Sequence, residues 1–248
     1  MAKKKPQKDK FLLKERWEIE DLVFDKETLL ALAKIMEKGI FEKLDYLISM
    51  GKEANVYRAK VQDGYVAVKI YKKETARFFK RHSYIVGDPR FPSLPKSERE
   101  LVNAFASKEF KNLKIAYKAG VAAPIPLYHL SNVVVMSFLG ENGLPYPKIA
   151  DDIIHISKED FYDVINSIKK LYANKLVHGD LSEYNILKGE KTYIIDFSQG
   201  VVLKHPRSEE LLHRDIRNIV KYFKKKTGLN VDINKVIKYV KGKAKGFY

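Results

Sequence analysis

The chain has 248 residues, of which 45% are hydrophobic, and a formal net charge of +16. That length and composition suit a globular protein of one large or two small lobes. The sequence contains no cysteine, which excludes disulfide bonds, nucleophilic cysteine chemistry and thiolate metal sites.

No apolar stretch approaches the roughly 20 residues that a membrane-spanning helix needs. The lysine-rich start leads into an amphipathic pattern rather than into the apolar run of a signal peptide. We therefore expect a cytoplasmic protein with no membrane partner.

The positive charge is concentrated in residues 1–10, 72–99 and 221–248. In these segments lysine and arginine outnumber acidic residues by 5 to 1, 8 to 3 and 9 to 1, so the rest of the chain is close to neutral. Basic segments around a neutral body favour polyanionic partners such as RNA, through the release of counterions. A solvated, lysine-rich surface explains the composition equally well.

In chain order, residues 1–14 are predicted to be a disordered or loosely held basic arm. Asp25 is expected to cap the start of a helix that ends at Gly39. A strand-rich stretch follows, with Asp63-Gly64 as a hairpin turn. Its predicted strands are residues 46–49, 56–61 and 65–71.

Residues 72–96 lack a regular period and contain one glycine and three prolines, which predicts a long loop. Ser97 and Glu100 have the spacing of a capping box and open a helix that runs to about Ala119. Gly120 is expected to end that helix. A buried strand is predicted after it, at residues 132–137.

A second capping box, Ser157 with Asp160, opens a helix whose apolar residues recur at helical spacing. This helix is expected to lead directly to His178. Residues 186–187 and 193–195 are then predicted to be two short strands joined by a turn. Two further helices close the chain.

Two charged residues occupy positions where the pattern predicts burial. Lys69 lies on an alternating strand, on the same side as the small residue Ala67, and Glu109 interrupts the apolar stripe of the long helix. Because an unpaired buried carboxylate is costly, Glu109 should have a cationic partner, and Lys69 is the best candidate. The alternatives are a solvated lysine, and a glutamate that meets water or pairs with Lys108 or Lys111.

Residues 176–187, LVHGDLSEYNIL, contain the pattern H-x-D-x-x-x-x-N. Asp180 lies on a loop, Asn185 directly precedes one short strand, and Asp196 follows the next. If these strands pair, Asn185 and Asp196 offer two oxygen ligands for Mg²⁺, with vacancies for water and phosphate oxygens. Asp180 is then placed to orient or deprotonate an incoming hydroxyl or water. His178 is expected to hold backbone geometry rather than to move protons.

The order strand lysine, helix glutamate, polar loop and strand-terminal aspartate predicts a phosphoryl-transfer site. On these residues the sequence resembles the protein-kinase superfold and, within it, the RIO family of atypical kinases, from about residue 20 onward. The resemblance is carried by SMGKEANVY at 49–57 (nucleotide loop), VAVKIY at 66–71 (lysine strand), KEF at 108–110 (helix signature), LSEYN at 181–185 (catalytic loop) and IDFSQ at 195–199 (metal loop).

Two further motifs, GDPRF at 87–91 and RDIRN at 214–218, resemble the first branch of that family. The second branch carries an N-terminal winged helix, and fewer than 50 residues precede the nucleotide loop here, which is too few for one. These features imply a first-branch member, and the overall resemblance implies an archaeal one.

The resemblance implies ATP and Mg²⁺ as cofactors, with Mn²⁺ as an alternative metal. It assigns Lys69 to the α- and β-phosphates, Glu109 to the support of Lys69, Asn185 and Asp196 to the metal, and Asp180 to the role of base.

The remaining nucleotide contacts also follow from the resemblance. Met136 is expected at the back of the adenine pocket, with backbone groups of Ser137 and Leu139 bonding the base, and with Val56 and Ala67 as further contacts. The alternative for residues 133–139 is an ordinary core strand.

The sequence departs from ordinary kinases in several places. Only Gly51 remains of the usual G-x-G-x-x-G, so Lys52 and Ser49 are expected to supply phosphate contacts. Ser198 replaces the usual glycine after Phe197, and Gly179 stands where the first branch commonly has alanine. No A-P-E motif appears and only 52 residues follow Asp196, so a conventional peptide-docking platform is not expected.

The expected fold class is α+β: a two-lobed, protein-kinase-like fold with a small, mostly antiparallel β N-lobe, a reduced helical C-lobe and an N-terminal helical extension. The predicted boundaries are residues 1–45 for the arm and extension, 46–139 for the N-lobe and 140–248 for the C-lobe.

The expected function is that of a RIO-type serine/threonine kinase and ATPase in maturation of the small ribosomal subunit. Its implied partners are the pre-small-subunit particle and its RNA. Autophosphorylation is a further implication, with Ser83, Ser93 and Ser97 as candidates, although a plain N-cap explains Ser97 better.

Three alternatives stay open. Asp196 itself could take the phosphoryl group in an ATPase switch. The chain could be a non-catalytic RNA- or ribosome-binding module. It could also be a small-molecule or tRNA-modification-linked kinase of similar fold.

Overall fold

The computed structural model describes residues 24–73, 84–91, 95–151 and 154–247. The predicted arm at residues 1–14 and the candidate serines Ser83 and Ser93 therefore lie outside the described residues. Within the described ranges, none of the helices has the length and apolar character that a membrane crossing requires.

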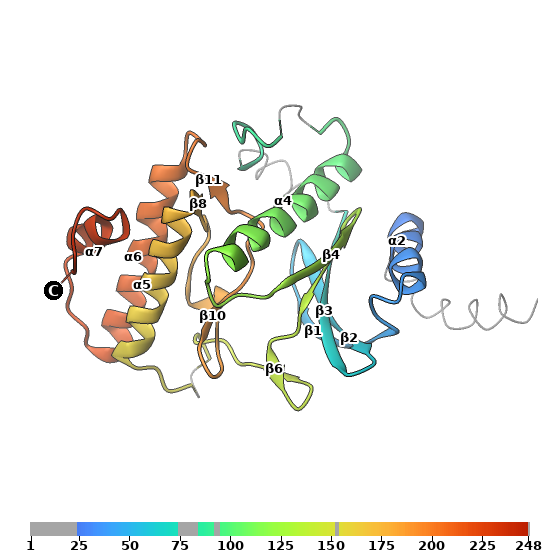
Figure 1. The fold of residues 1–248 in the computed structure, drawn as a ribbon, viewed down its shortest axis with the longest axis horizontal. Coiled ribbons are helices and arrows are strands. Elements are labelled where there is room, and N and C mark those ends of the chain that lie inside the picture. The colour runs from blue at the N-terminus through green and yellow to red at the C-terminus, as the bar shows by residue number, and fades with distance from the viewer. Residues whose placement is uncertain (1–23, 74–83, 92–94, 152–153, 248) are drawn as a thin grey trace, which may run out of the picture.

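A five-stranded antiparallel sheet forms one side of the molecule (Figure 1). Its strands lie in the order β1-β2-β3-β5-β4. A turn at residues 62–63, one residue before the predicted Asp63-Gly64, joins β2 to β3. Gly64 has a φ of 115°, which favours glycine. The strand bounds are β1 (Lys43–Met50), β2 (Ala54–Val61), β3 (Gly64–Tyr71), β4 (Pro126–Leu130) and β5 (Val133–Ser137).

The two faces of β3 pack against different parts of the protein, as its alternation predicts. Val66, Val68 and Ile70 belong to a core shared with helix α2 (Lys26–Glu37). Ala67 belongs to the other core, which extends into the helical lobe. Lys69 is buried on that second face, so the strand itself directs its side chain toward the space between the lobes.

Helix α4 (Glu98–Lys118) crosses from the sheet toward the helical lobe (Figure 1). Glu109 is buried on its inner stripe, as predicted. The capping box at its start is only half formed: Ser97 accepts from the Glu100 amide, but the Glu100 carboxylate accepts from the amide of Lys96. The other members of the buried stripe are Val102, Ala106 and Leu113.

The second lobe packs three helices, α5 (Lys158–Ala173), α6 (Ser208–Thr227) and α7 (Ile233–Val240), against one another. The predicted capping box of Ser157 and Asp160 is complete at the start of α5. Two short antiparallel strand pairs lie beside these helices. They are β8 (Leu176–Val177) with β11 (Val201–Val202), and β9 (Ile186–Lys188) with β10 (Thr192–Ile194).

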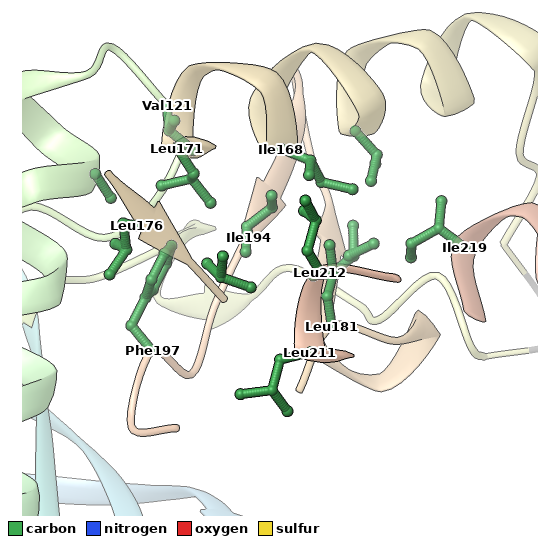
Figure 2. Packing of buried hydrophobic residues seen from close by; sticks show 14 of the residues in the cluster. Val121, Ile168, Leu171, Leu176, Leu181, Ile194, Phe197, Leu211, Leu212 and Ile219 are labelled. Atoms are coloured by element: carbon green, nitrogen blue, oxygen red, sulfur yellow. The ribbon is translucent and has the colours of Figure 1, made fainter. Parts of the chain in front are cut away.

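The core of this lobe brings distant segments together (Figure 2). Leu171 of α5, Leu176 of β8, Leu212 of α6 and Phe197 all belong to it and are almost fully buried. Phe197 directly follows Asp196, so the packing of one side chain anchors the neighbouring carboxylate to the lobe.

Further features of this architecture differ from the sequence prediction. Helix α5 ends at Ala173 rather than at His178, and the short strand β8 precedes His178. Strand β4 was not predicted because it begins with Pro126, and proline is tolerated at the start of an edge strand. The small hairpin β6 (Gly140–Glu141) and β7 (Leu144–Pro145) is too short to leave a periodic pattern. The lobe boundaries at residues 45 and 139 stay a prediction.

Candidate active site

Lys69 joins two acidic side chains in the space between the lobes. Its Nζ lies 2.8 Å from Oε1 of Glu109 and 2.9 Å from Oδ1 of Asp196. The side chains of Lys69 and Glu109 are 8% and 1% exposed, whereas that of Asp196 is 40% exposed. The predicted pair of Lys69 with Glu109 is confirmed, and the alternatives of a solvated lysine or a local partner are wrong.

The electrostatics of this group keep the lysine charged. Burial alone lowers the pKa of Lys69, but the adjacent carboxylates of Asp196 and Glu109 reverse the effect and raise it above its usual value. Burial raises the pKa of Glu109, opposed mainly by Lys69. The Tyr71 hydroxyl donates to the second oxygen of Glu109, so this carboxylate has a partner on each side.

Asp196 follows β10 and has a φ of 61°, a left-handed conformation that is uncommon outside glycine. The Ser198 hydroxyl donates to its Oδ1 at 2.6 Å, and the Ser198 amide donates to the same atom at 3.3 Å. Burial alone raises the pKa of this carboxyl, but Lys69 and Ser198 hold it well below its usual range. Asp196 is therefore an ionised carboxylate whose position is fixed by its neighbours.

The catalytic loop brings Asp180 and Asn185 together. Nδ2 of Asn185 donates to the Asp180 carbonyl at 2.9 Å, and the Asn185 carbonyl accepts from the Ile195 amide at 3.0 Å. The predicted pairing of β9 with β10 is present and brings Asn185 beside the residue that precedes Asp196. Gln199, which the sequence reasoning did not assign a role, donates to Oδ2 of Asp180 at 2.9 Å.

His178 holds the loop, as predicted. Its Nε2 lies 3.0 Å from the Ile195 carbonyl, and its Nδ1 accepts from the Asp180 amide at 3.3 Å. These two contacts fix the tautomer with the proton on Nε2. Burial lowers the pKa of His178 to about 4, so the ring is neutral and bridges the catalytic and metal loops.

Asp215 belongs to the RDIRN motif at 214–218 and is a buried residue of α6 for which the sequence predicted no individual role. Its two carboxylate oxygens accept from the amides of Gly179 at 2.7 Å and Leu181 at 2.9 Å, which flank Asp180. Burial raises the pKa of Asp215 to about 7, although the two amides and Arg214 favour the carboxylate. Arg214 also donates to the Gly179 carbonyl, so α6 holds both polar backbone groups of Gly179.

The nucleotide-contact residues predicted on the sheet lie on neighbouring strands. Val56 pairs with Lys69 across β2 and β3, and Ala67 pairs with Met136 across β3 and β5. Ala67 and Met136 are buried in the core that faces the helical lobe, and Val56 packs against it. These three apolar side chains therefore adjoin the charged group on one side of the sheet.

The nucleotide loop itself is a tight connection between β1 and β2. The Gly51 amide donates to the Ala54 carbonyl at 3.0 Å, and a Cβ at Gly51 would lie 2.7 Å from that oxygen, so a larger residue does not fit. Lys52 is exposed at the tip, and Ser49 pairs with Val56 in the strands. Their predicted phosphate contacts stay predictions.

Backbone groups at the end of β5 and just after it are partly used within the protein. The Ser137 amide donates to the Ile125 carbonyl at 2.8 Å, and the Leu139 carbonyl accepts from the Tyr146 amide at 3.0 Å. The prediction of adenine contacts therefore rests on the carbonyl of Ser137 and the amide of Leu139.

The oxygen ligands near Asp196 suit a cation that also binds phosphate. In the described part of the chain, no group of three or more His, Cys, Asp or Glu side chains could hold a metal by itself. Asp196 supplies an ionised carboxylate, and Asn185 uses its Nδ2 internally and keeps its Oδ1 for a ligand. Mg²⁺ often has only one or two protein ligands, such as a carboxylate and an amide oxygen, while phosphates and water complete its coordination shell.

Comparison with known proteins places these residues in a family. Residues 55–236 match the model of the RIO domain. The RIO-type serine/threonine-protein kinase Rio1 of Methanocaldococcus jannaschii is 41% identical over 87% of this chain and 76% of its own length. Its counterpart in Thermoplasma acidophilum is 39% identical over 68% of this chain and 90% of its own length.

A solved structure shares the fold. The crystal structure of the Rio2 kinase-ADP/Mg²⁺-phosphoaspartate complex from Chaetomium thermophilum aligns with a TM-score of 0.66. The alignment covers 87% of this chain and 65% of the Rio2 chain, at 21% sequence identity. With the antiparallel sheet and the helical lobe described above, this likeness shows the predicted two-lobed, kinase-like α+β fold.

Proposed function

The chain belongs to the RIO family and is a RIO-type serine/threonine-protein kinase, and we propose that it transfers the γ-phosphoryl group of ATP at a site between its lobes. The observation that carries this proposal is the contact of Lys69 with both Glu109 and Asp196. A strand, a helix and a loop each contribute one charged group to a single point, which is the arrangement that protein kinases use for phosphoryl transfer.

Lys69 is the proposed phosphate ligand. Its ammonium is charged, nearly buried and held from behind by Glu109, so it can donate to the α- and β-phosphates without a large change of position. Val56, Ala67 and Met136 supply the apolar wall against which the adenine would pack.

Asn185 and Asp196 are the proposed ligands of Mg²⁺. Both present oxygen atoms, and the carboxylate of Asp196 is ionised at neutral pH. Held by these two residues, Mg²⁺ would supply positive charge to offset the negative charge of the nucleotide phosphates. Ser198 and Lys69 hold the carboxylate in place, which limits the cost of arranging the site.

Asp180 is the proposed base. Gln199 donates to its Oδ2, while the backbone on both sides of it is fixed by Asp215. An aspartate held in this way can accept the proton of a serine hydroxyl as its oxygen attacks the γ-phosphorus.

The proposed setting is maturation of the small ribosomal subunit in the cytoplasm, with the precursor particle and its RNA as partners. The support is the concentration of positive charge in residues 72–99 and 221–248, which suits a polyanionic surface.

A second candidate is an ATPase switch in which Asp196 receives the phosphoryl group. Its carboxylate is ionised and 40% exposed, and the Rio2 kinase from Chaetomium thermophilum was crystallised as a phosphoaspartate complex. One carboxylate oxygen would bond to the γ-phosphorus as the bond to the β–γ bridging oxygen breaks, releasing ADP. Water would then hydrolyse the acyl phosphate to free phosphate and the original carboxylate.

One labelling experiment separates these functions. The wild-type chain, Asp180→Asn and Asp196→Asn are incubated with γ-labelled ATP, with and without purified small-subunit precursor. Acid-stable phosphoserine that Asp180→Asn abolishes supports the kinase. A hydroxylamine-sensitive label that Asp196→Asn abolishes and Asp180→Asn retains supports the switch. No turnover under either condition would overturn both.

A further inference from the structure

Helix α4 contacts the metal loop as well as Lys69. Asn112 lies three residues after Glu109, on the same side of the helix, and is fully buried. Its Nδ2 donates to the carbonyl of Phe197 at 2.8 Å and to the carbonyl of Gly200 at 2.8 Å. Both hydrogens of one side-chain amide are therefore used to hold the segment that begins directly after Asp196.

The orientation of that amide is set from its other end. Oδ1 of Asn112 accepts from the Arg90 guanidinium at 2.7 Å. Arg90 is held in turn by Asp88, whose Oδ1 and Oδ2 lie 2.9 and 2.7 Å from its nitrogens. Asp88 has no exposed side-chain surface. Asp88, Arg90 and Asn112 thus form a chain of hydrogen bonds that ends on the metal loop, and we call these three residues the Asn112 clamp.

The segment that carries Arg90 is itself attached to the helical lobe. His205 Nε2 lies 3.0 Å from the Val86 carbonyl, and a Cβ at Gly87 would lie 2.9 Å from Pro206. Arg214 contacts the Tyr84 hydroxyl at 3.3 Å. Residues 84–91 therefore connect the helical lobe, through the clamp, to the loop that follows Asp196.

From these contacts we infer that Asn112 is a positioning residue for the phosphoryl-transfer reaction, and that Arg90 fixes the orientation of the Asn112 side-chain amide. Neither residue is among the proposed ligands of the nucleotide or the metal. Asn112 holds the loop that begins next to Asp196 and that contains Gln199, the donor to Asp180. One buried amide thus restrains both the metal carboxylate and the base, and this inference rests on the proposed function.

The physical reason is that a carboxylate must be held in place to bind a metal and phosphate together. Partners that orient a metal ligand without touching the metal typically contribute tenfold or more to metal affinity. The backbone at Asp196 is in the left-handed region, so the loop needs contacts that keep it there. The two carbonyls that Asn112 holds, those of Phe197 and Gly200, belong to the segment directly after Asp196.

The test replaces Asn112 by aspartate, which keeps the acceptor for Arg90 but presents an oxygen to the two carbonyls. The measurement is the Mg²⁺ concentration for half-maximal ATP turnover. We expect it to rise about tenfold, with a fall in kcat of similar size, while binding of ATP in a chelator stays close to wild type. Asn103→Asp is the matched control, because Asn103 lies on the same helix and accepts from the Ser131 hydroxyl, away from the metal loop.

Two further variants keep the test decisive if Asn112→Asp does not fold. Arg90→Met removes the donor that orients the amide and should raise the Mg²⁺ requirement in the same way. Arg90→Lys retains one donor and should lie between Arg90→Met and wild type. The inference is overturned if folded variants of Asn112 and Arg90 have the Mg²⁺ requirement and kcat of wild type.

The proposed function can fail separately from this inference. If wild type shows no Mg²⁺-dependent turnover, or if Asp196→Asn leaves turnover unchanged, the assignment of the metal carboxylate is wrong. If Asp196→Asn abolishes turnover while Asn112→Asp behaves as wild type, only the role of the clamp is wrong.

Discussion

Nζ of Lys69 lies 2.9 Å from Oδ1 of Asp196, although 127 residues separate them in the chain. The contact joins the sheet to the metal loop, and Glu109 holds the same ammonium from helix α4. Three elements of the fold therefore meet at one cation, and its removal should disturb all of them.

Lys69→Met should abolish most activity and also weaken the fold. Loss of the phosphate ligand should lower kcat/KM at least about 100-fold. Because Glu109 would be left buried without its cation, the free energy of unfolding should fall by about 3 kcal/mol. Steady-state kinetics and denaturant unfolding measure the two effects. Lys60→Met, on the exposed side of β2, should change neither, and an active Lys69→Met variant would contradict the account.

Tyr71→Phe should have a smaller effect on the same group. The variant removes only the hydroxyl that donates to Glu109, so the carboxylate loses one partner and keeps Lys69. We expect kcat to fall about threefold to tenfold, with little change in the KM for ATP. Tyr117→Phe, at an exposed tyrosine, is the control. Equal kinetics for the two variants would show that the hydroxyl does not support Glu109.

Asp215→Asn should slow the reaction without weakening ATP binding. The asparagine has one acceptor and one donor group, so its NH₂ would face a backbone amide of Gly179 or Leu181. A displaced catalytic loop should lower kcat about tenfold to 100-fold and leave the KM for ATP within about threefold. Asp163→Asn, on the exposed side of α5, serves as the control. The role is refuted if kcat is unchanged in the folded variant.

Lys108 should make stability depend on pH. Burial lowers its pKa to about 7, partly opposed by the charge of Asp88, and its amine contacts the Ser198 carbonyl. Between pH 7 and the unfolded-state value near 10.5, the unfolded chain holds a proton that the folded protein has released. Raising the pH through this window therefore increases the free energy of unfolding.

The corresponding variant is Lys108→Met, which removes the buried amine. The free energy of unfolding of the variant minus that of wild type should be highest at pH 7 and below. Above pH 7 this difference should fall by up to about 1.4 kcal/mol per pH unit, because wild type gains stability there and the variant does not. Denaturant unfolding at pH 7 and at about pH 9 measures the difference. Lys118→Met, at an exposed position of α4, should show no such trend. A pH-independent difference for Lys108→Met would mean that Lys108 is not neutral in the folded protein.

The sequence allowed prediction of the parts of the site that lie on regular elements. The alternation of β3 placed Lys69 and Ala67 on one side, because successive strand side chains point to opposite faces. Glu109 was identified because a carboxylate interrupts an apolar helix stripe. The pairing of β9 with β10 followed from two short apolar runs around a turn.

Other parts of the site could not be found in this way, because their partners are backbone groups. Asp215 accepts from the amides of Gly179 and Leu181, and Asn112 donates to two carbonyls of the metal loop. Backbone amides and carbonyls occur at every position and leave no mark in the sequence. The short strand β8 was not predicted because two residues are too few to show a period.

The most direct test of the account is titration calorimetry of ATP binding, in Mg²⁺ and in a chelator, for wild type and Asp196→Asn. We predict that Mg²⁺ tightens ATP binding to wild type by about tenfold or more and that Asp196→Asn loses this gain, because the carboxylate at that position holds the ion. A wild-type affinity that ignores Mg²⁺, or an Asp196→Asn variant that keeps the full gain, would contradict a nucleotide and metal site at the contact of Lys69 with Asp196.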